Sequence, residues 1–392
     1  MQKKYICLYL HVHQPFRLKN YNIFDIGTTS DYFSLKNKQI FNKVSKKSYI
    51  PANRIFLRSL KKYKNFHLNL SITGTILEQM NCWDLDVLDS FKSLVLTKKV
   101  EIISETYYHS LASLYSLKEF KEQVILHKKI IKDLFNQTPT YFRNTELIYS
   151  DNIAQLVEDL GYKGILAEGT EKVLYWRSPN YLYQTNTNKG INLLLKNYKL
   201  SDDIAFRFSN RNWNEYPLTA EKYLHWIDNT PGEIINLFMD YETFGEHQWE
   251  DTGIFNFLEA FIKKAVRLGY KFLKVSQVNK YLSKKGVVSS PFIISWADTE
   301  RDISAWVDNS LQRDSLHKLY LLEKDVLNSG NEYIIKLWRN LQTSDHFYYM
   351  CTKWFNDGSV HKYFSPYQSP YEAFNNFNNV LIDLKSNLLR RR

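Results

Sequence analysis

Three acidic residues and a histidine directly follow the apolar residues 234–238. They belong to the segment Asp240-Tyr241-Glu242-Thr243-Phe244-Gly245-Glu246-His247. An apolar run of this length, bounded by polar residues, predicts a strand buried in a mostly parallel sheet. Charged groups at the end of such a strand are costly to desolvate, so packing alone does not explain them. Because catalytic groups gather at this end of the strands in barrel-type α/β folds, the segment predicts a catalytic site there.

Short apolar segments alternate with longer amphipathic segments up to about residue 285. Seven of them have the length and composition of strands: residues 5–10, 66–72, 100–103, 140–142, 164–166, 191–195 and 234–238. Residues 75–97, 117–135 and 150–160 show the 3.6-residue period of amphipathic helices. The alternation predicts an α/β fold whose parallel sheet closes into a barrel.

The pattern changes after residue 285. Residues 302–329, 331–342 and 370–387 have helical periodicity, and the loops between them are rich in Ser, Pro and Tyr. No flexible linker precedes this part of the chain. We therefore expect a barrel domain over residues 1–285 and a helical C-terminal region over residues 286–392 that packs against it.

Composition argues against several classes of function. The chain has 52 Lys and Arg against 41 Asp and Glu, a formal net charge of +11, but its basic residues are scattered in short pairs, so we expect no nucleic-acid partner. No apolar segment approaches the ~18 residues that span a membrane. Cys7, Cys82 and Cys351 have neither metal-ligand nor disulfide spacing, and no signal-peptide pattern precedes residue 11. These features predict a cytoplasmic protein without a membrane partner.

Two histidines close the first predicted strand, in His11-Val12-His13-Gln14-Pro15. Residues two apart in a strand share a face, so His11 and His13 point the same way. Such a pair can hold a metal ion, bind substrate hydroxyls or remain as satisfied buried polar groups. Its place at the carboxyl end of a strand favours a functional site.

Further acidic candidates follow other strands. Glu146 comes after the strand at 140–142, and Glu78 comes after the strand at 66–72. Taken alone, each is also compatible with an acid near a helix N-terminus, where negative charge is mildly favoured. Trp296, in Ser295-Trp296-Ala297-Asp298, and the pair Asp345-His346 are further candidates, although Asp345 could instead cap a helix.

Together these segments resemble glycoside hydrolase family 57, and in particular its α-amylases and α-amylase-like members. The resemblance rests on five segments in chain order: His-Gln-Pro at 13–15, Phe-Arg-Asn-Thr-Glu-Leu at 142–147, Asp-Tyr-Glu-Thr-Phe-Gly at 240–245, Ser-Asp-His-Phe-Tyr-Tyr-Met at 344–350, and the segment at 357–367. It spans nearly the whole chain.

The resemblance implies an incomplete, seven-stranded (β/α)7 barrel followed by a helical region. It also implies that Glu146 is the nucleophile and Asp240 the acid/base of a retaining hydrolysis. We expect Asp240 to be protonated in the free enzyme, because burial and a negative neighbour both raise the pKa of a carboxyl group. The candidates for binding the α-glucan or maltooligosaccharide substrate are His11, His13, Glu78, His247, Trp296, Asp345 and His346. This chemistry needs no cofactor and no metal.

Three alternatives remain open at this stage. A 4-α-glucanotransferase or branching enzyme would use the same two carboxylates, with a sugar hydroxyl instead of water as the acceptor. A metal-dependent deacetylase or mannosidase would use His11 and His13 as ligands. A non-catalytic glucan-binding protein would keep the cleft, but two buried acids would then cost stability without a function.

Overall fold

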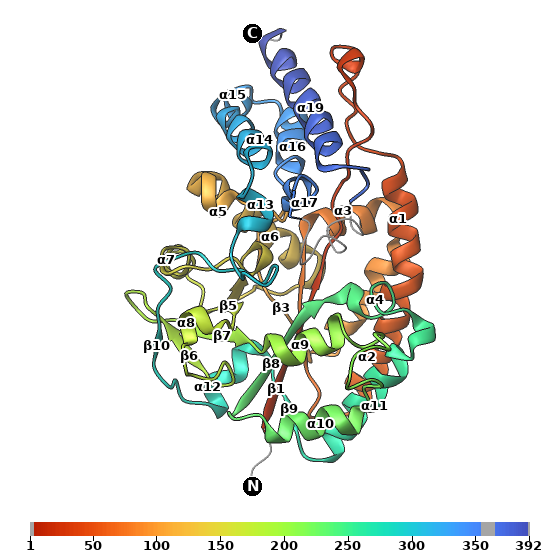
Figure 1. Ribbon diagram of the computed structural model, residues 1–392, viewed down its shortest axis with the longest axis vertical. Coiled ribbons are helices and arrows are strands. Elements are labelled where there is room, and N and C mark those ends of the chain that lie inside the picture. Colours follow the sequence, from red (N-terminus) through yellow and green to blue (C-terminus); the bar gives the residue numbers. More distant parts are fainter. Residues whose placement is uncertain (1–3, 354–364, 391–392) are drawn as a thin grey trace.

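The computed structural model describes residues 4–353 and 365–390 and places the strands in two sheets (Figure 1). The first sheet has the order β3 (Val100–Ile102), β2 (Leu68–Ile72), β1 (Tyr5–Val12) and β8 (Ile234–Asp240), and the two-residue strand β9 (Lys271–Phe272) also pairs with β1. Every pairing in this sheet is parallel.

The second sheet has the order β10 (Val287–Val288), β6 (Tyr183–Thr185), β7 (Asn192–Lys196), β5 (Gly164–Glu168) and β4 (Tyr141–Arg143). Its pairings are parallel except for β6 with β7. The short strands β6, β9 and β10 were not predicted; β9 and β10 have only two residues each, too few to show a period.

The seven predicted strands are all present, which confirms the α/β class, but the described strands do not form a closed barrel. One bridge, between Ser104 and Phe142, joins the end of β3 to β4. At the β8 edge of the first sheet, the Asn236 side chain donates to the Leu195 carbonyl of β7 at 2.8 Å. Strands β8 and β7 do not pair with each other as a ladder. Since β3 and β4 have only three residues each, their contact is too short to become a ladder.

Alternate strand residues meet between the two sheets. Tyr5, Cys7 and Tyr9 of β1 form a buried cluster with Phe238 of β8 and Leu194 of β7. The rings of Tyr9 and Phe238 meet edge to face with centroids 5.4 Å apart. This interior layer supports the carboxyl ends of the strands, and therefore the side chains that follow them.

Helices cover the outer face of the first sheet and share one hydrophobic cluster with it. They are α1 (Lys36–Val44), η2 (Ser45–Tyr49, a π-helix), α2 (Ile50–Lys62), α3 (Gly74–Trp83), α4 (Leu85–Leu96), α9 (Tyr198–Ala205), α10 (Ala220–Asn229) and α11 (Ile254–Arg267). The single helix predicted over 75–97 is two helices, because extended Asp84 interrupts it and its side chain accepts from Asp86 N at the start of α4.

A second cluster joins the other sheet to the C-terminal helices. Around that sheet lie α5 (Ala112–Tyr115), α6 (Leu117–Phe135), α7 (Asp151–Asp159) and α8 (Glu171–Leu174). Helix α6 has the predicted bounds, and α7 confirms the helix predicted over 150–160. Short elements in the connections are η1 (Ile23–Asp25), η3 (Thr145–Leu147), η4 (Tyr241–Thr243), η5 (Glu250–Thr252), η6 (Val275–Gln277) and α12 (Val278–Tyr281).

The C-terminal helices form the upper part of the molecule in Figure 1. They are α13 (Ser304–Val307), α14 (Ser310–Leu321), α15 (Glu323–Asn328), α16 (Glu332–Asn340), α17 (Ser344–Tyr348) and α19 (Pro370–Arg390). The helix predicted over 302–329 is thus three helices. The division at residue 285 remains a prediction, although β10, beyond it, pairs with β6. Most of the motif at 357–367 lies outside the described residues.

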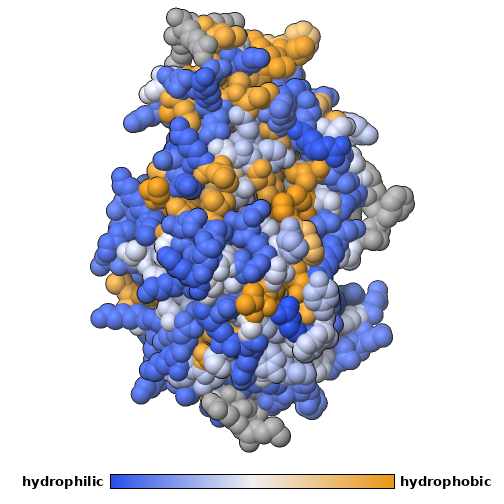
Figure 2. All heavy atoms as spheres, turned by 90° about the vertical axis from the view of Figure 1, so that its left-hand side faces the viewer, coloured by the Kyte–Doolittle hydropathy of each residue, from blue (hydrophilic) through white to orange (hydrophobic). Residues whose placement is uncertain are grey.

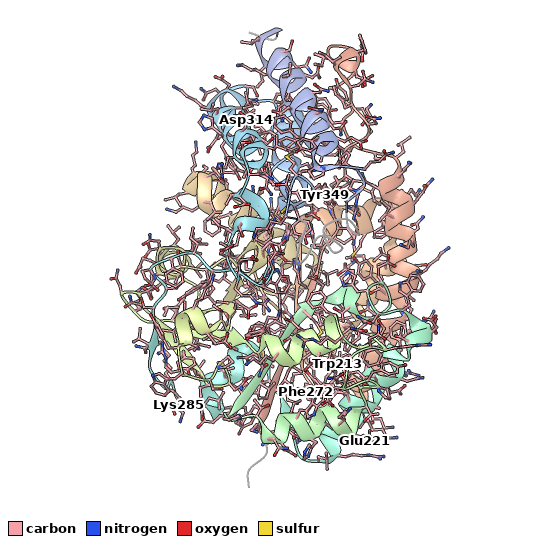
Figure 3. The ribbon with its side chains drawn as sticks, in the orientation of Figure 1. Trp213, Glu221, Phe272, Lys285, Asp314 and Tyr349 are labelled. Carbon is pink, nitrogen blue, oxygen red and sulfur yellow. The ribbon has the colours of Figure 1, made fainter. Side chains whose placement is uncertain are left out.

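Side chains fill the space between the helices and the sheets, and Tyr349, at the end of α17, lies near the middle of the molecule (Figure 3). Figure 2 shows a mostly hydrophilic face with apolar side chains at the upper end and in smaller patches across the middle. Exposed apolar residues of the C-terminal helices include Leu321, Ile382 and Leu389. Within residues 4–353 and 365–390, no helix has the length and apolar character needed to cross a membrane.

Candidate active site

The pairing of β1 with β8 brings the first two predicted residues together. His11 lies opposite Asp240 in the register of these strands, and His11 Nδ1 is 3.4 Å from Asp240 Oδ1. Asp240 is the last residue of β8, and its side chain remains 41% exposed, while that of His11 is 3% exposed. A buried imidazole therefore faces a carboxylate that substrate can reach.

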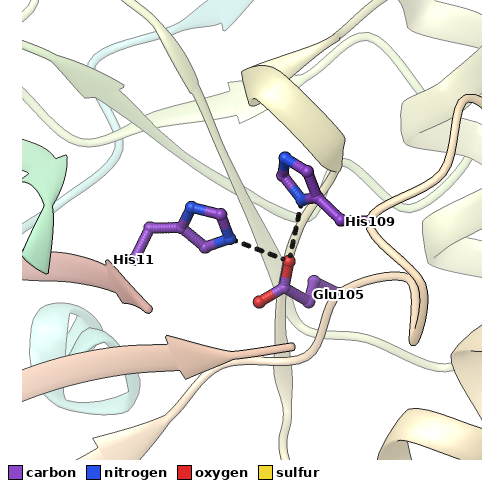
Figure 4. Close-up of side chains that lie close together, drawn as sticks. All are labelled: His11, Glu105 and His109. Atoms are coloured by element: carbon purple, nitrogen blue, oxygen red, sulfur yellow. Dashed lines mark hydrogen bonds and ion pairs between the residues drawn. The ribbon is translucent and has the colours of Figure 1, made fainter. Parts of the chain in front are cut away.

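Glu105 and His109, which were not among the predicted site residues, lie beside His11 (Figure 4). Glu105 Oε2 is 3.1 Å from His11 Nε2 and 3.5 Å from His109 Nδ1. Both residues follow β3 in Glu105-Thr106-Tyr107-Tyr108-His109. The signal was present in the sequence, because an acid and a histidine after a strand form the same pattern that singled out residues 240–247.

Glu146 lies in η3, just after β4, and three side chains donate to its carboxylate. His109 Nε2 is 2.9 Å from Oε1, Ser344 Oγ is 3.2 Å from Oε1, and Trp296 Nε1 is 2.7 Å from Oε2. The backbone of Glu146 has φ 57° and that of His109 has φ 52°. Non-glycine residues adopt this region at a cost, and such strain is concentrated at functional sites.

The C-terminal region supplies two of these three donors. Residues 294–296 pair with the segment around Glu146 through the bridge between Tyr149 and Ile294 and a bond from Trp296 N to Glu146 O of 3.2 Å. Ser344 N donates to His109 O at 2.9 Å. The loops after β3 and β4 therefore bind the C-terminal region directly at the site.

The predicted residues His13 and Asp345 also meet here. His13 Nε2 is 3.0 Å from Asp345 Oδ2, and its Nδ1 is 2.9 Å from Thr73 Oγ1. The His13 ring lies 4.2 Å from the His109 ring, centroid to centroid. Glu146, Asp240, His11, His13, Trp296 and Asp345 therefore belong to one cluster of side chains in contact.

The remaining predicted residues have other surroundings. The Glu78 carboxylate accepts from Tyr107 Oη at 2.9 Å and pairs with Lys336 at 2.8 Å. His247 is partly exposed, and its charge interacts with Asp240. His346 is buried, and its ring lies 5.6 Å from that of Phe377. Substrate contact by these three residues, as by the other predicted binding residues, remains a prediction.

Two buried cations lie against the indole of Trp296. The Arg143 guanidinium carbon is 4.8 Å from the ring centroid, and Lys196 Nζ is 5.2 Å from it. Arg143 is fully buried and its Nη1 is 3.9 Å from Glu105 Oε2. Contacts of this kind stabilise a cation over an aromatic face and restrain the ring.

The electrostatic surroundings give the two catalytic candidates low pKa values. Burial opposes ionisation of Glu146, but the hydrogen bond and positive charge of His109, aided by Arg143, lower its pKa below the usual value. Burial likewise opposes ionisation of Asp240, but contact with His11 and its charge, together with His247 and Arg143, lowers its pKa to about 2. The prediction that Asp240 is protonated in the free enzyme is therefore wrong, because His11 outweighs the burial.

Two neighbouring groups hold protons instead. Burial would lower the pKa of His109, but its contacts with Glu105 and Glu146 raise it to about 9. Burial, and after it the charge of Asp240, raises the pKa of Glu242 to about 8. At neutral pH the site thus contains ionised Glu146 and Asp240 beside a protonated imidazole and a neutral carboxyl group.

Two groups of side chains have the composition of a metal site. They are His11, Glu105 and His109, and His13, His109 and Asp345, with the potential ligand atoms of each group within 4.8 Å of one another. A histidine ligates only through an unprotonated nitrogen, so a metal would have to displace the proton that His109 holds.

Comparisons with known proteins agree with one another. Residues 7–291 match the family model described as "Glycosyl hydrolase family 57". A protein of Methanocaldococcus jannaschii named "Putative alpha-amylase" is 47% identical over 389 residues, which cover 95% of this chain and 82% of that protein.

Solved structures share the fold. A 4-alpha-glucanotransferase from Thermococcus litoralis has a TM-score of 0.69 at 15% identity, and the match covers 88% of this chain and 56% of that chain. An alpha-amylase from Thermotoga maritima has a TM-score of 0.64 at 14% identity, over 99% of this chain and 93% of that chain. The chain thus spans little more than half the length of the transferase.

Proposed function

The chain belongs to glycosyl hydrolase family 57, and from that premise we propose that it cleaves α-1,4-glucosidic bonds in starch, glycogen or maltooligosaccharides with retention of configuration. One observation carries the proposal: Glu146, after β4, is held by three donors and is ionised, as a nucleophile must be. The fold and the partly exposed Asp240 at the end of β8 support it.

In the first step of this mechanism, a Glu146 oxygen attacks the anomeric carbon and the bond to the leaving sugar breaks. Asp240 protonates the leaving oxygen. Because Asp240 is ionised in the free enzyme, it must first receive a proton, and His11 Nδ1 at 3.4 Å is placed to provide it. A sugar that covers the exposed part of Asp240 removes water from it, which favours the neutral carboxyl group.

In the second step, water attacks the anomeric carbon of the glycosyl ester. Asp240, now ionised, takes a proton from that water, and the Glu146 carboxylate leaves. Donors aimed at Glu146 stabilise its charge as it reappears. His109, Trp296 and Ser344 make these contacts.

His13 and Asp345 are suited to bind the sugar rather than to react with it. Burial and the neighbouring charge of His109 lower the pKa of His13 to about 4, so it is neutral at physiological pH. The neutral His13 ring uses its two nitrogens to contact Asp345 and Thr73, so it orients Asp345, whose other carboxylate oxygen can accept from a sugar hydroxyl. We assign these two residues to binding the donor sugar, whose anomeric carbon Glu146 attacks.

The test is the analysis of products from maltoheptaose with wild type, Glu146→Gln and Asp240→Asn. Glu146→Gln keeps the side-chain shape, and we expect kcat to fall on the order of 10³-fold or more while maltoheptaose still binds. Matched folding of the variants is checked by circular dichroism. Wild-type rates in Glu146→Gln would remove this residue as the nucleophile.

The same experiment separates the remaining activities. Shorter sugars alone indicate hydrolysis, whereas shorter and longer sugars together indicate transfer to a sugar acceptor. Binding of maltoheptaose without any turnover by the wild type would indicate a glucan-binding protein or a different glycan substrate.

A further inference from the structure

We propose that Glu105 is a positioning residue that holds His11 and His109 through one carboxylate oxygen and so fixes the imidazole that lies beside each of the two catalytic carboxylates. The proposal rests on the roles given above to Glu146 and Asp240, but its geometric part can be tested without turnover.

The contacts follow one another in the structure, two of them as hydrogen bonds and two as longer ion pairs. Asp240 Oδ1 is 3.4 Å from His11 Nδ1, and His11 Nε2 is 3.1 Å from Glu105 Oε2. The same Oε2 atom is 3.5 Å from His109 Nδ1, and His109 Nε2 is 2.9 Å from Glu146 Oε1. Each imidazole therefore spans two carboxylates, and Glu105 is the carboxylate that both share (Figure 4).

The complete burial of Glu105 supports a positioning role for its carboxylate. Its side chain is 0% exposed, and a buried carboxylate is costly unless charged partners compensate for it. The charged and titratable groups around it are His11, His109, Arg143 at 3.9 Å, and His127, whose Nδ1 accepts from Glu105 N at 3.4 Å. Apolar residues would fill this space at lower cost, so stability alone does not account for the carboxylate.

Glu105 has a different consequence for each imidazole. On the side of His109, two carboxylates face the two ring nitrogens, which keeps this histidine protonated and directs an N–H at Glu146. When Glu146 becomes a neutral ester, His109 no longer has a negative charge beside its Nε2 atom. Glu105 then keeps the ring in place until the carboxylate returns.

On the side of His11, Glu105 determines which nitrogen is free. When Nε2–H donates to Glu105, Nδ1 is left to exchange one proton with Asp240 Oδ1. A carboxylate that orients a histidine in this way does not react itself, yet its loss leaves the wrong tautomer. Glu105 therefore acts through His11 and does not touch the substrate.

The experiment compares Glu105→Gln with Glu101→Gln. Glu101 lies on the same strand-and-loop segment, but its carboxylate accepts from Ser276 Oγ at 2.7 Å, away from the site. We expect Glu105→Gln to lower kcat about 10²-fold or more with KM changed less than about 3-fold, and to shift the pH–rate profile. Glu101→Gln should retain wild-type values.

A second readout does not depend on turnover. In protein labelled with ¹⁵N-histidine, NMR reports the protonation and tautomer of each imidazole. Glu105→Gln should move the titration of His109 to lower pH and change the tautomer of His11. Glu105→Asp keeps the charge but shortens the side chain, and it should restore the His109 titration in part; it also serves if Glu105→Gln does not fold.

The outcomes separate the two proposals. Unchanged histidine signals and an unchanged pH–rate profile in Glu105→Gln would overturn the role of Glu105. If the wild type does not cleave maltoheptaose but Glu105→Gln changes both histidines as expected, the positioning role of Glu105 stands and the proposed substrate fails.

Discussion

At the scale of single residues, the site works because neighbours assign different protonation states to similar groups. Asp240 and Glu242 are both acids at the end of β8, yet the pKa of Asp240 falls to about 2 while that of Glu242 rises to about 8. The difference comes from partners: Asp240 faces His11, whereas Glu242 is buried beside the charge of Asp240 and bonded to Tyr49 Oη. Such divergence between adjacent acids is typical of catalytic sites.

The raised pKa of Glu242 predicts that the stability of the protein depends on pH. An acid whose pKa is higher in the folded state binds its proton more tightly there, so its contribution is fully present below the unfolded pKa of about 4.3 and is lost as the pH rises through about 8. We expect Glu242→Gln, which has the same shape and no charge, to reduce the fall of Tm between pH 5 and 8. Thermal unfolding followed across this range tests it.

The control for that measurement is Glu122→Gln, which removes an acid from an exposed position of α6. It should leave the slope of Tm against pH as in the wild type. An equal slope in wild type and Glu242→Gln would show that Glu242 ionises in the folded protein as it does in the unfolded chain.

At the scale of elements, the segment after β8 depends on its contact with the π-helix η2. A Cβ atom built on Gly245 would lie 2.0 Å from Lys47 O, and Gly245 has φ 112°. Gly253 has φ 82°, but nothing lies within 4 Å of the corresponding position. The two glycines thus share a positive φ and differ in the steric contact.

We therefore expect Gly245→Ala to be more destabilising than Gly253→Ala. Backbone strain alone costs about 1 kcal/mol in either variant, and the close contact with Lys47 O adds about 1–3 kcal/mol in Gly245→Ala. Chemical denaturation of both variants measures the difference. Equal unfolding free energies would mean that η2 moves aside without cost.

Sequence patterns predicted the elements that are long and periodic. All seven main strands and α6 were recognised, because buried strands and amphipathic helices leave continuous signals. The break at Asp84 was not recognised, since one extended residue does not change the apolar period around it. The split into two sheets depends on how few residues β3 and β4 contribute to their pairing, which no local pattern encodes.

The candidate site was predicted where one strand end carries its own motif. Asp240, Glu146 and His11 were identified in this way, whereas Glu105 was passed over although it also follows a strand. Its importance comes from the registers that bring β1, β2 and β3 side by side, so that it meets His11 across 94 positions of the chain. Contacts of such sequence separation are visible only in the folded structure.

At the scale of the whole molecule, the site joins the two parts of the chain. Trp296 and Ser344 come from beyond residue 285, and both donate to Glu146. The hydrophobic cluster behind them is also shared: it contains Phe142 and Leu193 from the second sheet together with Trp338 from α16. A core that crosses the proposed division couples the stability of the two parts.

This shared core predicts that the protein unfolds in one cooperative transition. We expect a single calorimetric peak, with calorimetric and van't Hoff enthalpies that agree. Trp338 is fully buried in α16, so Trp338→Ala should lower the unfolding free energy by about 3–5 kcal/mol through the cavity it leaves. The whole unfolding transition should then move to lower temperature, and a probe of the two sheets should show the same shift.

The contrary result would be two peaks, of which Trp338→Ala moves only one. That result would mean that the C-terminal helices unfold while the sheets remain, so that Trp296 and Ser344 leave Glu146 before the barrel-like part is lost. Loss of activity would then precede loss of the main transition on heating. If the site lies across a single core, activity and the folded structure should be lost over the same temperature range.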